Sequence, residues 1–315
     1  MSTPPPRLQD RSSGRFSSRF SSRFGIRFGR RFGSRFPDAS HRLGGPRGAR
    51  CVTPALLAGA GIVSFWIICA LWAPALVPYD PFATHPLQAL LAPSAHHWFG
   101  TDQLGRDVFS RVLTGARDVL SVAPLATLLG ALGGTVIGLL AGYLGGWIDQ
   151  AISRVLDALL ALPLVIVALL ALAALGGSDL TMILVIGATF APMSARTVRA
   201  AVLSERHLDY VAAAQSRGES TLRILSAEIL PNVMTPIIVE AAVRLGYAIF
   251  TVATLSFLGF GTQPPSADWG LTLSENYTLL AGGAWWTVAF SAAATASLVI
   301  GVNLVADALQ RTVTR

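Results

Sequence analysis

The sequence VLSVAPLATLLGALGGTVIGLLAG, residues 119–142, contains no charged side chain and is almost entirely apolar. It is long enough to cross a membrane as a helix, because a hydrocarbon core of about 30 Å needs about 20 apolar residues. Similar stretches lie at about 54–77, 157–176, 180–199, 233–258 and 285–306. The pattern predicts an all-α, polytopic membrane protein with six transmembrane helices.

The composition agrees with lipid as the main solvent. Of the 315 residues, 52% are hydrophobic and only 13% are charged, which is too little polar surface for an ordinary soluble domain. The net charge of +7 comes from residues 1–50, which hold 12 Arg against two Asp, whereas the rest of the chain is acidic. Because the basic charge stops where the first apolar stretch begins, we exclude nucleic acid as a partner.

Lysine is absent from the sequence, so all 24 basic side chains are Arg. A phosphate-binding P-loop has the pattern G-x-x-x-x-G-K-[ST], in which the lysine reaches the phosphates of the nucleotide. The chain is therefore not expected to bind ATP through such a loop, and no cofactor of its own is predicted.

The N-terminal segment is a low-complexity tract in which Arg-Phe recurs every four residues, from Arg15-Phe16 to Arg35-Phe36. Its Ser and Gly spacers are poor helix formers, and the tract has no apolar core. We predict a disordered cytoplasmic tail over residues 1–50, followed by a transmembrane domain over residues 51–315. The tail either lies on anionic membrane lipid or is a dispensable extension.

The distribution of Arg predicts the orientation in the membrane. Arg is frequent in the tail and between Arg196 and Arg223, and it is absent from the linkers 177–179 and 259–284. By the positive-inside rule, both termini and the 200–232 loop face the cytoplasm. The segment 78–118 is then external, although it contains three Arg residues that nearby Asp residues balance: Arg106, Arg111 and Arg117.

The 200–232 loop predicts two short helices around a break. An Ala-rich helix is expected at Tyr210–Ser216, and Gly218 suits a left-handed helix end. Three apolar residues share one face of the next segment at helical spacing, and Pro231 marks its boundary: Leu222, Leu225 and Ile229. Such a ridge either docks in the groove of a partner or packs against its own bundle.

This loop also resembles the cytoplasmic loop of ABC importer permeases. The shared pattern is carried by Ala213, Ala214, Gly218 and the ending Ile229-Leu230-Pro231, with Ala212 where the family usually has Glu. Two further motifs are similar to the C-type permease of the dipeptide, oligopeptide and nickel branch: FGTDQLGRD at 99–107 with Ser110-Arg111, and SFLGFGTQPP at 256–265 with Trp269-Gly270. The motif AGYLGG at 141–146 adds to the resemblance. The resemblance covers about residues 54–310.

The resemblance implies a non-catalytic permease subunit that forms half of the path for di- or oligopeptides. The implied partners are a second homologous permease, two cytoplasmic ATPase subunits or one fused ATPase, and an extracytoplasmic solute-binding protein. ATP and Mg would be bound by the ATPases. The residues implied to couple this chain to the ATPases are Tyr210, Ala213, Ala214, Gly218, Leu222, Leu225, Ile229, Leu230 and Pro231.

Two further groups of charged residues are candidate site residues. Glu240 and Arg244 lie four apart within the fifth predicted span, where they either line the translocation path or form a structural ion pair along the helix. Asp102, Arg106 and Asp107 lie in an external loop. They either shape the mouth that receives the binding protein or form a self-capped structural turn.

The His and Trp residues receive structural interpretations. His85, His96 and His97 have no nearby carboxylate or thiol at ligand spacing, so no metal site is predicted. The last group of aromatic side chains is expected to anchor the chain at the membrane interface: Trp269, Trp285 and Trp286.

Two other classes of function remain as alternatives. An intramembrane protease needs a His inside the bundle, whereas every His of this chain falls outside the predicted spans. A secondary transporter or channel typically has internal repeats, and none is visible. The importer permease is therefore the preferred hypothesis.

Overall fold

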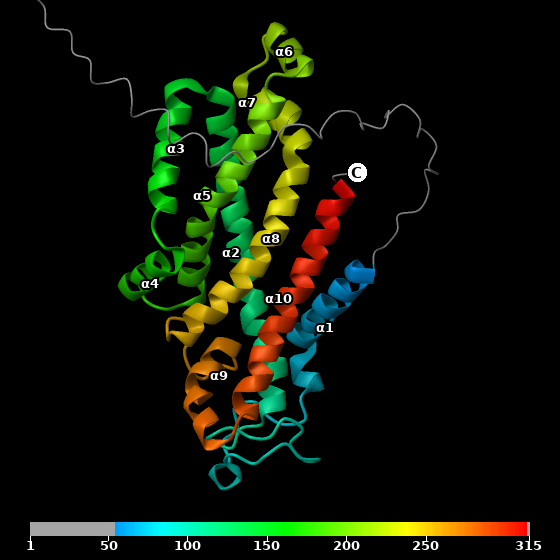
Figure 1. The fold of residues 1–315 in the computed structure, drawn as a ribbon, viewed down its shortest axis with the longest axis vertical. Helices are drawn as coiled ribbons and strands as arrows, with labels where there is room; N and C mark the ends of the chain where they lie inside the picture. Colours follow the sequence, from blue (N-terminus) through cyan, green and yellow to red (C-terminus); the bar gives the residue numbers. More distant parts are fainter. Residues whose placement is uncertain (1–53, 314–315) are drawn as a thin grey trace, which may run out of the picture. The chain divides into compact units, whose positions relative to one another are not determined.

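The computed structural model describes residues 54–313, and all of the regular secondary structure in this range is helical (Figure 1). The predicted tail 1–50 and Cys51 lie outside the described residues. Within residues 54–313, five helices are long and apolar enough to cross a membrane. They are α1 (Pro54–Leu76), α2 (Val108–Leu144), α5 (Asp179–Glu205), α8 (Leu230–Phe257) and α10 (Trp286–Val313). The prediction of an all-α, polytopic membrane protein is confirmed.

The third predicted span, 157–176, is not one straight helix. It is divided between α3 (Gly146–Leu160) and α4 (Leu164–Leu175), which meet at an angle of 84°. The break falls at Pro163, because proline lacks an N–H and disfavours the helical conformation of the residue before it. Alone, α4 is only about 18 Å long at 1.5 Å per residue, so a sixth span exists only if the bent pair crosses the membrane together.

Helix α2 begins well before the predicted start of the second span. Asp107 caps its first turn by accepting a hydrogen bond from the backbone N–H of Ser110, which satisfies one of the free donors at a helix N-terminus. The polar sequence around residue 110 hides this start from a search for apolar runs. The first turns of α2 therefore belong to the same helix as the span.

Helices α2 and α5 pack backbone to backbone along a row of small residues, as is common between membrane helices. A Cβ atom at Gly134 would lie 2.5 Å from the Cβ of Ser194, and one at Gly138 would lie 2.7 Å from the carbonyl oxygen of Ala195. Both distances are far below van der Waals contact. Glycine is therefore required at these positions for the two helices to approach this closely.

The remaining elements lie at the two ends of the bundle (Figure 1). At one end, α6 (Asp209–Ser216), α7 (Thr221–Arg223) and the π-helical turn η2 (Ile224–Ile229) connect α5 to α8. At the other end, α9 (Trp269–Asn276) and η3 (Tyr277–Gly282) connect α8 to α10. The loop between α1 and α2, which contains η1 (Pro86–Gln88), lies at this second end.

Candidate functional site

The 200–232 loop has the predicted helix and the predicted left-handed break. Helix α6 covers the expected residues, and Gly218 has a φ of +75° directly after it. Val211 and Ala214 are buried, whereas Ala212 and Ala213 are exposed on the opposite side of α6. The loop therefore has one side that packs on the bundle and one side that is free for a partner.

Tyr210 ties α6 to the end of α5. Its hydroxyl donates to Glu205 Oε2 at 2.7 Å. Partial burial, together with this carboxylate, raises the pKa of Tyr210 to about 12, so the phenol stays protonated and keeps donating. This hydrogen bond fixes the angle at which α6 leaves α5.

The expectation that Leu222, Leu225 and Ile229 share one face is wrong. Leu222 is 76% exposed, but Leu225 and Ile229 are buried in an apolar cluster that also contains residues of α2 and α5. The cause is the π-helical turn η2, because a helix with i→i+5 hydrogen bonds turns less per residue than an α-helix. Residues three and seven apart then no longer share one face. The alternative interpretation, packing against its own bundle, is correct for this part of the loop.

Charged side chains form ion pairs in the same part of the loop as the exposed Leu222. Arg217 contacts Glu219 at 2.7 Å and Glu228 at 3.5 Å, and Arg223 contacts Glu219 at 3.5 Å. The two Arg side chains are largely exposed. The exposed surface of the loop thus combines the apolar side chain of Leu222 with the guanidinium groups of Arg217 and Arg223.

Glu240 and Arg244 form the predicted ion pair on α8. Arg244 Nε lies 2.6 Å from Glu240 Oε1, and the side chains are 17% and 14% exposed respectively. Arg244 also contacts Met193 Sδ on α5 at 3.4 Å and lies 5.4 Å from the centre of the Tyr247 ring. The two side chains thus form an ion pair along α8 that stays partly exposed, and a place in the translocation path stays a prediction.

Asp102 and Arg106 belong to a buried ion network at the opposite end of the bundle. Arg106 bonds to Asp102 Oδ2 at 2.6 Å and to Glu275 Oε2 of α9 at 2.7 Å. Burial lowers the pKa of Arg106, but the two carboxylates outweigh it and the net shift is upward. Arg111 completes the network at 3.6 Å from Glu275. The self-capped structural turn is therefore what the structure shows, and a role in shaping an external mouth stays a prediction.

Asp107 is likewise engaged within the chain. Its Oδ2 accepts hydrogen bonds from the N–H and the Oγ of Ser110, and its Oδ1 lies 2.9 Å from His97 Nδ1. Among the described residues, no group of three His, Cys, Asp or Glu side chains is placed to hold a metal ion.

Trp269 is a core residue, so the expectation of an interfacial anchor is wrong. Its side chain is fully buried, its Nε1–H donates to the carbonyl of Val112 at 2.8 Å, and its ring packs edge-to-face on Trp66. The space is made by Gly115, where a Cβ atom would lie 2.7 Å from the indole. Trp285 remains exposed, as an interfacial residue requires.

Sequence reasoning missed the ion pairs that join α3 to α5. Arg199 binds Asp149 through Nε at 2.5 Å and Nη2 at 2.7 Å, and Arg196 bonds to Asp157. The partners lie 39 to 50 positions apart in the sequence, so no local sequence spacing predicts these ion pairs. The only available signal was the presence of charged residues inside or beside predicted spans.

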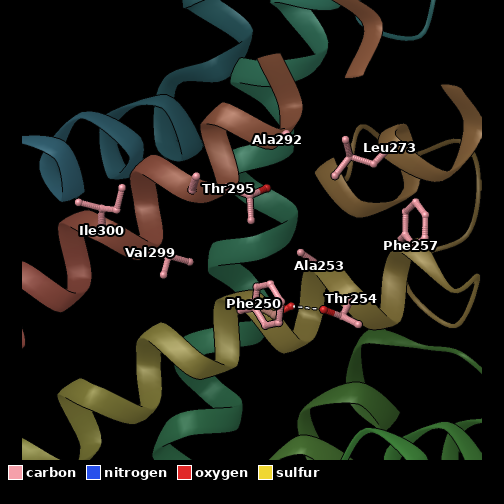
Figure 2. Close-up of a pocket in the computed structure, with 10 residues that line it drawn as sticks. Phe250, Ala253, Thr254, Phe257, Leu273, Ala292, Thr295, Val299 and Ile300 are labelled. Carbon is pink, nitrogen blue, oxygen red and sulfur yellow. Dashed lines mark hydrogen bonds between the residues drawn. The ribbon is translucent and has the colours of Figure 1, made fainter. Parts of the chain in front are cut away.

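An apolar groove of about 490 Å³ lies between α8, α9 and α10 (Figure 2). Phe250, Thr254 and Phe257 line it from α8, Leu273 from α9, and Val299 with its neighbours from α10. The Thr254 hydroxyl donates to the carbonyl of Phe250 at 2.8 Å, so its polar atom is satisfied within α8. The groove contains no charged residue and is suited to apolar contacts only.

Comparison with known proteins identifies a family. The model of the binding-protein-dependent transport system inner membrane component matches residues 134–315. The dipeptide transport system permease protein DppC of Alkalihalophilus pseudofirmus is 39% identical over 81% of this chain and 83% of its own length. The probable D,D-dipeptide transport system permease protein DdpC of Escherichia coli is 36% identical over 82% and 86%. The glutathione transport system permease protein GsiD of Pectobacterium atrosepticum is 38% identical over 66% and 70%.

Proposed function

Because the chain belongs to the family of binding-protein-dependent transport system inner membrane components, we propose that it forms half of the path by which a di- or oligopeptide crosses the membrane. The observation that carries the proposal is its similarity, over about four fifths of the chain, to permeases named for dipeptide transport. The ion pair of Glu240 and Arg244 supports it, because a zwitterionic peptide needs complementary charge in its path.

The proposed complex contains a second homologous permease, two cytoplasmic ATPases or one fused ATPase, and an external solute-binding protein. This chain supplies the path and no catalytic activity. ATP and Mg are bound by the ATPases, consistent with a sequence in which lysine is absent and a P-loop cannot form.

The proposed orientation has both termini and the 200–232 loop in the cytoplasm. Arg206, Arg217 and Arg223 lie at this end of the bundle, in agreement with the positive-inside rule. The loop before α2 and the helix α9 then lie on the external side, where the binding protein delivers the solute.

In the proposed mechanism, the exposed surface around Leu222 and α6 receives the motion of the ATPases when they bind ATP. Tyr210 fixes α6 to α5, and the close packing of α2 on α5 makes these helices move together. A displacement at the loop is therefore transmitted as a movement of a rigid pair of helices, which shifts the permease between inward-open and outward-open states.

Reconstitution tests the proposal. Proteoliposomes containing both permeases and the ATPases should accumulate a labelled dipeptide only when ATP and the loaded binding protein are both present. A secondary transporter would instead move peptide through this chain alone, driven by an ion gradient and without ATP. That result would replace the importer with the rival function.

A further inference from the structure

The ion pair between Asp157 of α3 and Arg196 of α5 lies on the surface of the bundle. The side chain of Asp157 is 50% exposed and that of Arg196 is 54% exposed. Both helices belong to the segments predicted to lie in the membrane. A charged pair that faces hydrocarbon is costly, and such residues normally face the interior of a bundle or water.

This pair and the ion pair of α8 lie at similar distances along their helices. At 1.5 Å per residue, Arg196 lies about 26 Å along α5 from Asp179, and Glu240 lies about 26 Å along α8 from Phe257. Asp179 and Phe257 are the ends of these helices that lie away from α6 (Figure 1). With those ends at the outer margin of a core of about 30 Å, as the proposed orientation has them, both ion pairs lie near its inner margin.

The two ion pairs are linked through α5, which contacts both α3 and α8. Arg244 of α8 contacts Met193 of α5, and Met193 lies three residues before Arg196 on the same helical face. Helix α5 runs between α3 and α8 (Figure 1). We call this group of side chains the charged station: Asp157, Arg196, Met193, Arg244 and Glu240.

We propose that the charged station lies in the wall of the solute path at its cytoplasmic end, where the free ammonium and carboxylate of a passing peptide exchange with the internal ion pairs. The inference rests on the proposed peptide path and adds Asp157 and Arg196 to it. A half-exposed ion pair is weak, so the carboxylate of a peptide displaces Asp157 from Arg196 at little cost. The more buried Arg244 and Glu240 then form the less exchangeable half of the station.

Asp157 and Val155 provide a matched pair of positions for a test. Both lie on α3 at nearly the same depth and both are about half exposed, with Val155 at 59%. Two residues apart on an α-helix, they point to nearly opposite sides. Cys51 and Cys69 are first replaced by Ala in the complete complex, and this background complex is tested for peptide uptake. Asp157→Cys and Val155→Cys are then introduced into it one at a time.

A charged, membrane-impermeant methanethiosulfonate applied from the cytoplasmic side should label Asp157→Cys about tenfold faster than Val155→Cys, because only a hydrated thiol forms the reactive thiolate. A lipid-soluble maleimide should label Val155→Cys readily. Both labelling rates are also measured in the Arg196→Gln background. A neighbouring guanidinium lowers the pKa of a thiol, so Arg196 by itself would speed the labelling of Asp157→Cys. Addition of the transported dipeptide should slow the labelling of Asp157→Cys.

Other labelling patterns overturn the inference. Reaction of Asp157→Cys with the lipid-soluble reagent alone would place the pair against lipid. Failure of both reagents would mean that the second permease covers it. A background complex that takes up no peptide would instead contradict the proposed function, so the two failures are distinguishable.

Uptake by charge variants gives an independent readout. Asp157→Asn and Arg196→Gln should each lower peptide uptake about fivefold, which is the size of effect expected for the loss of one exposed charge contact. ATP hydrolysis stimulated by the loaded binding protein should change less than about twofold. The exchanged pair, Asp157→Arg with Arg196→Asp, distinguishes a role in the solute path from a purely structural role. It restores the ion pair but reverses its polarity along the path, so uptake should stay low. Full recovery would show that the pair only holds α3 on α5.

Discussion

Arg106 Nη2 donates a hydrogen bond to Glu275 Oε2 at 2.7 Å, and this ion pair joins the loop before α2 to the short helix α9. Asp102, which binds the same guanidinium, is fully buried. The contact therefore holds two separate segments together at the end of the bundle that we propose to be external.

Removal of this guanidinium should destabilise the protein. Arg106→Gln leaves the buried Asp102 without its closest cation, and we expect a loss of about 2 kcal/mol in the free energy of unfolding, less than for a fully isolated pair because Arg111 remains nearby. Thermal unfolding in detergent measures the effect. Arg223→Gln, on an exposed side chain, is the control and should change stability by less than about 0.5 kcal/mol. Equal effects of the two substitutions would contradict the structural role.

Substitution of Gly134 should disrupt the contact between α2 and α5, whereas substitution of its neighbour should not. A Cβ atom at Gly134 would lie 2.5 Å from Ser194 Cβ, but one at Gly133 would lie 3.5 Å from Ala191 Cβ, an ordinary contact. Gly134→Ala should cost about 1–3 kcal/mol, while Gly133→Ala should be neutral or slightly stabilising, since alanine favours a helix. The amount of folded, monodisperse protein and its unfolding temperature report the difference.

Gly218→Val should impair coupling without preventing insertion. Open space surrounds the position, so steric contact is not the cause, but the φ of +75° is strained for a β-branched residue. The change redirects α7 and the exposed Leu222. Uptake and solute-stimulated ATP hydrolysis should fall together, whereas the amount of permease in the membrane should remain normal.

Gly218→Asn is the control for this effect, because Asn tolerates the left-handed conformation. It should retain most of the uptake. Normal transport by Gly218→Val would mean that the shape of this break does not matter for coupling.

Asp268 should make stability depend on pH. Burial raises the pKa of this α9 capping residue to about 6 in the folded protein, above its value of about 4 in the unfolded chain. The folded state then binds the proton more tightly, so stability is lost as the pH rises from about 4 to about 6. Asp268→Asn keeps the hydrogen bond to the Leu271 N–H but carries no charge.

At about pH 7.5, Asp268→Asn should therefore be more stable than the wild type by about 2 kcal/mol, and the difference should shrink towards pH 4. Unfolding temperatures over this pH range measure it. Asp268→Ala removes the cap as well as the charge and should gain less. A less stable Asn variant at neutral pH would show that the ionised carboxylate is required.

Labelling of cysteines at two exposed positions tests the proposed orientation in the membrane. A cysteine at Ser216, the last residue of α6, should react with an impermeant reagent only from the cytoplasmic side, and a cysteine at Leu87, in the loop before α2, only from outside. The reverse pattern would invert the proposed orientation.

The features that were predicted correctly depend on local sequence. The apolar spans follow from runs of about 20 residues, because lipid selects for each segment separately. The left-handed Gly218 and the ion pair of Glu240 with Arg244 follow from preferences and spacings within a few residues.

Tertiary structure decided the features that depend on distant partners. Pro163 predicts a break in the helix, but only tertiary packing sets the 84° angle between α3 and α4. Leu225 turns inward because the π-helical turn η2 rotates it into the buried apolar cluster that also contains residues of α2 and α5. Trp269 fills a space left by Gly115 of α2, and Arg196 meets a carboxylate 39 positions away. The sequence by itself determined which segments enter the membrane and where charge is available. Which side chains meet was decided by the close approach of helices, because burial and pairing depend on neighbours that no local spacing encodes.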